Sequence, residues 1–308
     1  MTHMGRPRAK NVESLRLDPL AKRLSALLKK KVTKLDEITG KKVTDTLQKS
    51  VIGDIFMLEN LRFDPREEEN SMEFAKELAS LGDIYVNEAF SNSHREHASM
   101  LGITKLLPSY AGLLLEKEIE NLSRARENPK KPLAVIIGGV KISTKLGLIK
   151  IFLEIADDVI VGGALANMML KAKGISVGKS VIEKDMIDKT KKIDLTSTKL
   201  HIPLDVIVSD DPNSEKSPKT KAVGNVFNDE YILDIGPDTI KLFISVIKKA
   251  KTIIWNGPMG YVENPKFRKA TKEILHSVLL SDADIVIGGG DSLKMINNKI
   301  LEKNIFLS

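Results

Sequence analysis

Residues 133–145, LAVIIGGVKISTK, contain the pattern that decides the fold of this chain. The apolar run from Leu133 to Ile137 has the length of a strand, and Lys141 and Lys145 follow after two glycines. Continuous apolar runs are typical of strands buried in parallel sheets, which bind ligands at the carboxyl ends of their strands. Lysines spaced by four lie on one helix face. The segment therefore predicts either a phosphate site or a strand, a turn and a solvated lysine pair.

Strand-like runs recur through the second half of the chain. They span 133–137, 158–161, 204–209, 252–255 and 284–287, and nearly all are continuously apolar, as buried parallel strands are. Glycine-rich loops follow in the forms GGVK from Gly138, GGAL from Gly162, WNGPMG from Trp255 and GGGDS from Gly288. Loops at the carboxyl ends of strands in a doubly wound sheet converge on one crevice. This half therefore predicts such a sheet with one ligand-binding crevice.

The first half also alternates helix and strand patterns. We expect helices over 15–30 and 67–80 and strands over 31–35, 54–59 and 83–86. The stretch 110–128 carries apolar residues at helical spacing and is closed by Pro129 and Pro132, so we expect a long helix there. Because it separates two series of strands, this helix is the expected domain boundary.

Composition excludes several classes of protein. The 308 residues contain no apolar run long enough to cross a membrane, and no signal-peptide pattern, which favours the cytoplasm. The lack of cysteine excludes disulfides and thiolate metal sites. The net charge of +7 permits nucleic-acid binding, but only 5% of residues are aromatic, which weakens base stacking. Anionic small substrates explain the basic excess at least as well.

Several loops carry candidate binding residues. In GGGDS, backbone amides can cradle a phosphate, and Asp291 and Ser292 can serve a hydrated Mg²⁺, although the same residues can simply cap a helix. Asn256 can bind a nucleotide phosphate or base and Glu263 a ribose diol, unless WNGPMGYVE is only a packed turn. Three loops of the first half carry histidines and arginines: His3, Arg6, Arg62, His94, Arg95 and His97. These residues either bind the carboxylate and phosphate groups of a ligand or are unrelated surface charges.

Taken in order, these segments resemble the phosphoglycerate kinase family along the whole chain. The family's histidine-glycine-arginine-proline loop corresponds to residues 3–7, its arginine motif to LENLRF at 58–63 and its histidine-arginine loop to 94–99. The nucleotide-side motifs follow in family order as GGVKISTK, GGALAN, DIGP, WNGPMGYVE and GGGDS. The resemblance implies an α/β fold of two Rossmann-like three-layer αβα domains with mainly parallel sheets, joined by a long helix.

The resemblance also implies domain limits and an activity. We expect an incomplete phosphoglycerate-binding domain at 1–110, a linking helix at 111–129 and a nucleotide-binding domain without its C-terminal end at 130–308. The implied reaction, part of glycolysis, is reversible phosphoryl transfer between 1,3-bisphosphoglycerate and Mg-ADP, giving 3-phosphoglycerate and Mg-ATP. The implied protein is a cytoplasmic monomer without nucleic-acid or membrane partners.

Residue roles follow from the same resemblance. Lys145, supported by Lys141, would be catalytic, and Asp291 would face the Mg²⁺. The substrate-binding residues would be His3, Met4, Gly5, Arg6, Arg62 and Arg95. The nucleotide-binding residues would be Lys145, Gly162, Gly163, Asn256, Glu263, Gly289, Gly290, Asp291 and Ser292.

Compared with the family, the chain has no counterpart of the N-terminal strand, of a catalytic arginine that follows it, or of the last helix. We therefore expect an impaired enzyme. The alternatives are a non-catalytic nucleotide-binding remnant or pseudoenzyme, and a basic nucleic-acid-binding protein whose binding would depend steeply on salt.

Overall fold

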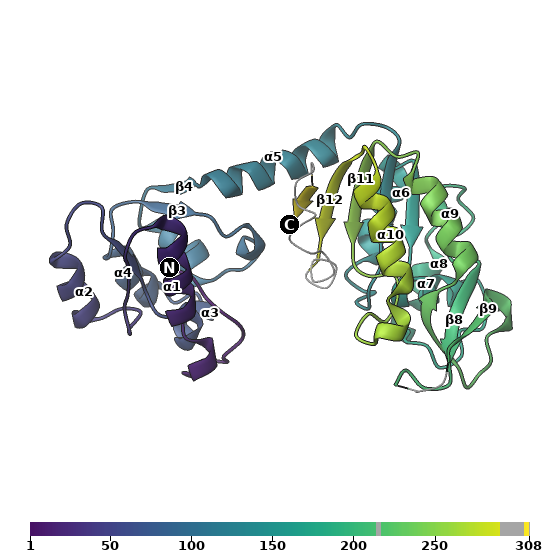
Figure 1. The fold of residues 1–308 in the computed structure, drawn as a ribbon, viewed down its shortest axis with the longest axis horizontal. Coiled ribbons are helices and arrows are strands. Elements are labelled where there is room, and N and C mark those ends of the chain that lie inside the picture. The colour runs from purple at the N-terminus through teal and green to yellow at the C-terminus, as the bar shows by residue number, and fades with distance from the viewer. Residues whose placement is uncertain (214–216, 290–304, 308) are drawn as a thin grey trace. The chain divides into compact units, whose positions relative to one another are not determined.

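The computed structural model describes residues 1–213, 217–289 and 305–307. The chain divides into two compact units, Met1–Lys117 and Glu118–Ser308. Each unit has its own strands and its own hydrophobic clusters (Figure 1). Helix α5 (Leu113–Glu127) contains the point of division. Among the described helices, none has the length and apolar character needed to cross a membrane.

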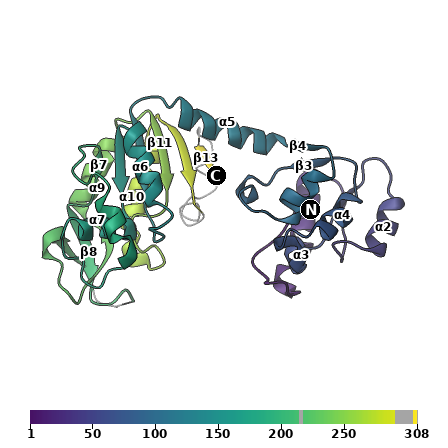
Figure 2. The ribbon, with the colours of Figure 1, turned by 180° about the vertical axis from the view of Figure 1, so that it is seen from behind.

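A six-stranded parallel sheet with the order β13-β12-β11-β5-β6-β7 forms the centre of the second unit. Its strands are β5 (Leu133–Ile137), β6 (Asp158–Val161), β7 (Leu200–His201), β11 (Thr252–Asn256), β12 (Asp284–Gly288) and β13 (Ile305–Leu307). The chain continues from β5 toward one edge of the sheet and from β11 toward the other (Figure 2). The boundary between β5 and β11 is therefore the switch point, where open α/β sheets bind their ligands.

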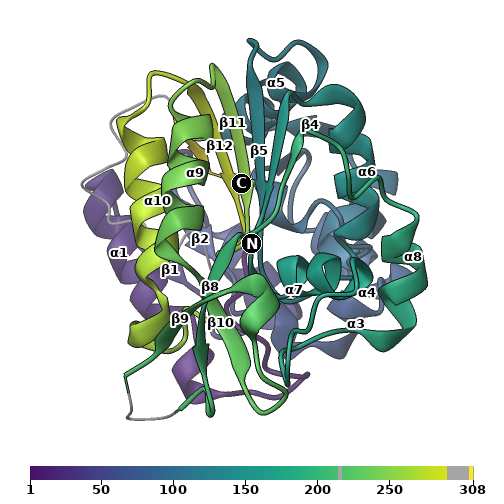
Figure 3. The same ribbon diagram turned by 90° about the vertical axis from the view of Figure 1, so that its right-hand side faces the viewer.

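Helices cover both faces of this sheet (Figure 3). On one face are α6 (Leu146–Ile155), α7 (Gly163–Ala172) and α8 (Ile187–Lys191), and on the other are α9 (Pro237–Ile247) and α10 (Lys269–Leu280). Leu133, Val135 and Ile137 pack into the first layer, whereas Ala134 and Ile136 pack into the second. Strand β5 is continuously apolar because its successive side chains enter two different cores.

A second, antiparallel sheet of three strands contains β8 (Asp205–Ser209), β9 (Lys219–Ala222) and β10 (Tyr231–Ile235). We expected the run 204–209 in the parallel sheet, and that prediction is wrong. The connection from β8 to β9 is too short for a crossover between parallel strands, which requires a dozen or more residues. The two strands can therefore pair only as antiparallel neighbours.

The first unit contains two separate parallel pairs of strands. They are β1 (Val32–Lys34) with β2 (Ile55–Met57), and β3 (Tyr85–Asn87) with β4 (Ser109–Ala111). Around them lie the helices α1 (Asp18–Leu28), α2 (Lys41–Gln48), α3 (Pro65–Glu68) and α4 (Met72–Ala79). The fold as a whole is therefore α/β with mainly parallel strands, which confirms the fold class expected from the sequence.

Two expected helices of the first unit differ from prediction. The stretch 67–80 is interrupted, because Asn70 has a φ of 53° and Ser71 begins a new helix by accepting a hydrogen bond from Phe74 N. The stretch 110–128 becomes helical only at Leu113, since Ser109–Ala111 pairs with β3. In the second case, pairing with a distant strand overrides the local helical spacing of apolar residues. The spacing of apolar residues in the sequence does not indicate that pairing.

A buried carboxylate ties together several segments of the first unit. Glu59 is 3% exposed, and its Oε1 accepts hydrogen bonds from Leu17 N and Asn60 N at 3.0 and 2.8 Å. Its Oε2 lies 2.6 Å from Lys34 Nζ and 3.3 Å from Arg16 Nη2. Removing a cation from such a cluster leaves a buried charge only partly compensated.

We predict that Lys34→Met destabilises the first unit by about 3 kcal/mol, because the Glu59 carboxylate then retains Arg16 as its cation. Hydrogen exchange measured by mass spectrometry should show faster exchange in peptides covering β1 and β2. The exposed Lys30→Met is the matched control and should leave exchange unchanged. Equal exchange in Lys34→Met and the control would contradict the role given to this cluster.

Candidate functional site

Two glycine loops meet by direct backbone contact at the switch point of the six-stranded sheet. Gly138 N donates to Asn256 O, and Gly139 N donates to Pro258 O, both at 2.9 Å. A Cβ atom at Gly138 would lie 2.0 Å from Pro258 O, so no side chain fits there. The loops that follow β5 and β11 are therefore held together at the lip of the sheet.

The loop after β6 joins the same junction. Gly163 N donates to Met259 O at 2.8 Å, and Gly163 has a φ of 61°. A Cβ atom on Gly163 would lie 2.7 Å from Gly139 N. Gly162 is buried just behind, where a Cβ atom would meet Met259 Sδ at 2.7 Å. Of the GGGDS loop, Gly288 and Gly289 are described, whereas Gly290, Asp291 and Ser292 lie outside the described residues.

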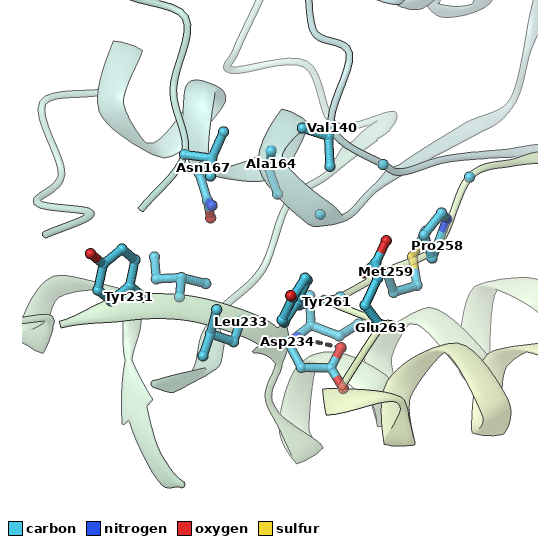
Figure 4. Close-up of a pocket in the computed structure, with 18 of the residues that line it drawn as sticks. Val140, Ala164, Asn167, Tyr231, Leu233, Asp234, Pro258, Met259, Tyr261 and Glu263 are labelled. Atoms are coloured by element: carbon cyan, nitrogen blue, oxygen red, sulfur yellow. Dashed lines mark hydrogen bonds between the residues drawn. The ribbon is translucent and has the colours of Figure 1, made fainter. Parts of the chain in front are cut away.

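A cavity of about 600 Å³ opens in front of these loops (Figure 4). Six predicted site residues line it: Lys141, which we predicted to support catalysis, and the predicted nucleotide-binding residues Lys145, Gly163, Asn256, Glu263 and Gly289. Gly162 is not among the lining residues and shapes the site only through its close packing. The structure thus brings together, in one cavity, residues separated by more than a hundred positions in sequence.

The Lys145 ammonium lies at the junction of the glycine loops. Its Nζ donates to Gly138 O at 2.5 Å, and a Cβ atom at Gly257 would lie 2.7 Å from Nζ. Lys145 is half-buried, whereas Lys141 is exposed at the rim of the cavity. The position of Lys145 at the switch point makes its charge available to an anion bound in the cavity.

Two helices begin at this end of the cavity. Lys145 occupies the N-cap position of α6 and Gly162 that of α7, and neither caps its helix with a side chain. The first backbone N–H groups of a helix have no intrahelical partner and attract anions. Two helix starts beside a lysine ammonium therefore form a site suited to phosphate groups.

Sequence analysis missed several residues that line the other parts of the cavity. They include Asn167 of α7, Tyr231, Leu233 and Asp234 of β10, and Tyr261 (Figure 4). Asn167 follows Gly163 by four residues, so helical spacing after the GGALAN glycines could have indicated it. No comparable signal marks β10, because it reaches the cavity through a separate antiparallel sheet.

Asp234 is a buried acid in the wall of the cavity, 3% exposed. Its Oδ1 accepts from Ile235 N at 3.0 Å and its Oδ2 from Ala270 N at 3.1 Å. Burial raises the pKa of Asp234 to about 7, with a further contribution from Glu273, although the two backbone donors oppose the shift. Asp234 therefore joins β10 to the start of α10 with a carboxyl group that titrates near neutral pH.

A cationic cluster forms separately in the first unit. Burial, and then the neighbouring charges of Arg62, His97 and Arg95, lower the pKa of His3 to about 4. His3 is thus neutral at pH 7, and its Nδ1 lies 3.2 Å from Asn92 Nδ2. The three loops predicted to bind an anion therefore come together, and His3 can contribute a hydrogen bond but no charge.

The arginines of this cluster differ in how they are held. Arg62 is 6% exposed, donates to Gly5 O at 2.9 Å and lies 3.4 Å from Glu68 Oε1. The Nε of Arg95 is buried and has no hydrogen-bond partner within the described parts of the chain. Arg6 is exposed. The guanidinium groups of Arg6 and Arg95 are thus the ones best placed to bind a ligand.

The loop of His3 is anchored through its backbone. Asn60 Nδ2 donates to Met4 O and to Leu15 O, both at 2.9 Å. The side chain of Met4 packs against the apolar cluster that contains Leu17. Met4 and Gly5 therefore hold the loop in place, with Gly5 accepting from the Arg62 guanidinium.

Comparison with known proteins gives one consistent result. The family model described as Phosphoglycerate kinase matches residues 1–307. The chain is 44% identical to a phosphoglycerate kinase of Gloeothece citriformis, over 96% of this chain and 76% of that protein. It is 42% identical to one of Pelotomaculum thermopropionicum, over 95% of this chain and 75% of that protein.

Solved structures agree with the sequence matches. The phosphoglycerate kinase of Coxiella burnetii aligns with a TM-score of 0.80 at 37% identity, covering 99% of this chain and 79% of that one. The phosphoglycerate kinase of Pyrococcus horikoshii aligns with a TM-score of 0.85 at 30% identity and the same coverage. Sequence and fold therefore lead to the same family.

The raised pKa of Asp234 predicts an unusual pH dependence of stability. An acid whose pKa is higher in the folded state stabilises the fold below its unfolded pKa, and this stabilisation is lost as the pH rises to about 7. The free energy of unfolding of the natural chain, relative to Asp234→Asn, should fall by roughly 4 kcal/mol between pH 4 and pH 8. Urea unfolding followed by the fluorescence of Trp255 measures this, and a pH-independent difference would contradict it.

Proposed function

The chain belongs to the phosphoglycerate kinase family, and we propose that it transfers a phosphoryl group reversibly between 1,3-bisphosphoglycerate and Mg-ADP. The products are 3-phosphoglycerate, whose carboxyl group is the acceptor in the reverse direction, and Mg-ATP. The observation that carries this proposal is the cavity of the second unit, where Lys145 and two helix starts meet at the switch point.

The nucleotide binds in this cavity. Its phosphates lie against the starts of α6 and α7, near Lys145 and Gly289, where backbone N–H groups and an ammonium neutralise their charge. Asn256, whose Nδ2 would lie 3.6 Å from a Cβ atom at Gly289, supplies an amide at the same end. Glu263 also lines the cavity, and its carboxylate accepts hydrogen bonds from the ribose diol.

Transfer itself requires positioning and charge compensation more than covalent chemistry. The transferring phosphoryl group carries its charge on three equatorial oxygens, and fixed cations near them lower the barrier. Lys145 is the described cation closest to the glycine junction, where its hydrogen bond to Gly138 O fixes its position. Lys141, at the rim, supports it electrostatically.

The phosphoglycerate binds to the cationic cluster of the first unit. Arg6, Arg62 and Arg95 offer guanidinium groups, which pair with carboxylate and phosphate oxygens in a bidentate manner. His3 adds a neutral imidazole, because its pKa is lowered to about 4. Met4 and Gly5 place this loop through their backbone carbonyls.

Magnesium fits this chemistry as a partner of the nucleotide. Among the described residues, no group of three or more His, Asp or Glu side chains could hold a metal ion alone. Mg²⁺ in such enzymes is held mainly by substrate phosphates with one or two carboxylates. When bound, it supplies positive charge to the phosphate oxygens. We assign Asp291 as its carboxylate on the strength of the GGGDS motif.

The same family membership supports the remaining parts of the proposal. The protein acts in glycolysis as a cytoplasmic monomer that binds small anionic substrates and neither nucleic acid nor membranes. The basic excess, a net charge of +7, then serves to attract these substrates.

We also propose that this chain turns over slowly. Both strand pairs of the first unit are two-stranded parallel sheets, which are marginally stable unless both faces are covered. Val86 and Tyr110, which pair across β3 and β4, are 54% and 60% exposed. A loosely held first unit would weaken the phosphoglycerate site more than the nucleotide cavity, and in the limit leaves a protein that only binds nucleotide.

Calorimetry and a coupled assay test this proposal together. We expect binding of both Mg-ADP and 3-phosphoglycerate, together with a phosphoryl transfer rate below that of the phosphoglycerate kinases to which the chain is similar. Binding of nucleotide without 3-phosphoglycerate would instead identify a non-catalytic remnant. Turnover equal to that of the relatives would contradict slow catalysis while supporting the reaction itself.

Lys145→Met should lower kcat by about 10²- to 10³-fold relative to the unmodified chain, because a positioned charge at the transferring group is lost. The affinity for ADP should change much less, since the helix starts remain. Lys150→Met, an exposed lysine of α6 outside the cavity, is the matched control and should retain activity. Similar kcat values for both variants would exclude Lys145 from the transfer step.

A further inference from the structure

Asn167 is a polar residue of the cavity wall whose side-chain amide has no hydrogen-bond partner among the described residues. Asn167 is 4% exposed and lies in α7, where the neighbouring residues from Ala164 to Leu170 are also buried. Figure 4 shows this amide pointing from α7 into the cavity. Because this amide faces the cavity and forms no hydrogen bond within the described residues, its donor and acceptor are available to a ligand group.

The surroundings of Asn167 suit a flat aromatic ring. Tyr231 and Leu233 of β10 face it across the cavity (Figure 4), and Pro203 and Val206 add apolar wall. Aromatic and aliphatic side chains stack on nucleobases, whereas they offer nothing to a phosphate. This part of the cavity therefore fits a base whose polar edge meets one amide.

Asn167 lies one helical turn from the phosphate end of the cavity. Gly163, the first residue of α7, approaches Gly139 so closely that a Cβ atom would lie 2.7 Å from Gly139 N. Residues spaced by four share a helix face, and a rise of about 1.5 Å per residue separates them by about 6 Å. A nucleotide with phosphates beside Gly139 thus extends its base along α7 toward Asn167.

We propose that Asn167 selects adenine over other purines by binding the N6 and N7 edge of the base. This inference rests on the proposed function, since it requires that the cavity binds a nucleotide. The amide oxygen accepts from the 6-amino group while the amide NH₂ donates to N7, a pairing that asparagine makes with adenine elsewhere. Hypoxanthine and guanine present two acceptors at this edge, O6 and N7, so in either orientation the amide oxygen faces an acceptor and cannot form a hydrogen bond.

Calorimetry with the unmodified chain tests this directly. Mg-IDP differs from Mg-ADP only in the base, where a 6-carbonyl replaces the 6-amino group, so ADP should bind about tenfold more tightly, within the range expected for one bidentate contact. Equal affinities would overturn the inference and leave the proposed function intact. Failure of both nucleotides to bind would contradict the proposed function itself.

Variants separate base selection from a structural role. Asn167→Leu keeps a similar volume without the amide, and Asn167→Ser is a second variant in case leucine packs badly. In both, the preference for ADP over IDP should fall to within about twofold, whereas a structural defect would weaken both nucleotides alike and leave the ratio unchanged. Asn228→Leu, on an exposed turn outside the cavity, is the matched control and should keep the full ratio.

Discussion

The cavity of the second unit depends on the close approach of glycine backbones at the switch point of the parallel sheet. The register of β5 and β11 places Ile137 opposite Asn256, so the loops after both strands leave the sheet at the same level. Backbone atoms then approach to distances that no Cβ atom would permit. Lys145 and the starts of α6 and α7 take their positions from this junction, because each is bonded to or packed against it.

Carboxylates that accept backbone hydrogen bonds hold segments of the chain next to functional side chains in both units. Glu183 accepts hydrogen bonds from Ile142 N and Ser143 N, within the segment that carries the two cavity lysines. In the first unit, Glu67 accepts from Ser99 N and Oγ and thereby holds the loop of the histidine-arginine motif. An acid that accepts several hydrogen bonds tolerates burial, whereas an unpaired acid does not.

The two sites differ in the kind of positive groups that they present. In the function that we propose, the cavity of the second unit neutralises phosphate charge with ammonium groups and helix starts, which do not require exact geometry. The cluster of the first unit uses guanidinium groups held by specific partners, as Arg62 is held by Gly5 O and Glu68. Burial, together with the neighbouring charges of Arg62, His97 and Arg95, lowers the pKa of His3 and keeps it uncharged. A carboxylate-bearing substrate needs the directional contacts, and a nucleotide phosphate chain needs mainly charge.

The sequence by itself determined the family, four of the six parallel strands of the second unit and six lining residues of its cavity, because continuous apolar runs followed by glycines are local signals of buried strands and close turns. It did not indicate β7 or β13, which are too short to give such a run. It did not reveal the antiparallel sheet, the break at Asn70 or the pairing of Ser109–Ala111, since strand partners are chosen by distant residues. Only the tertiary structure decided that Asp234 and Asn167 share one cavity. Burial, which raises the pKa of Asp234, and the packing that turns the Asn167 amide toward the cavity exist only once the chain is folded.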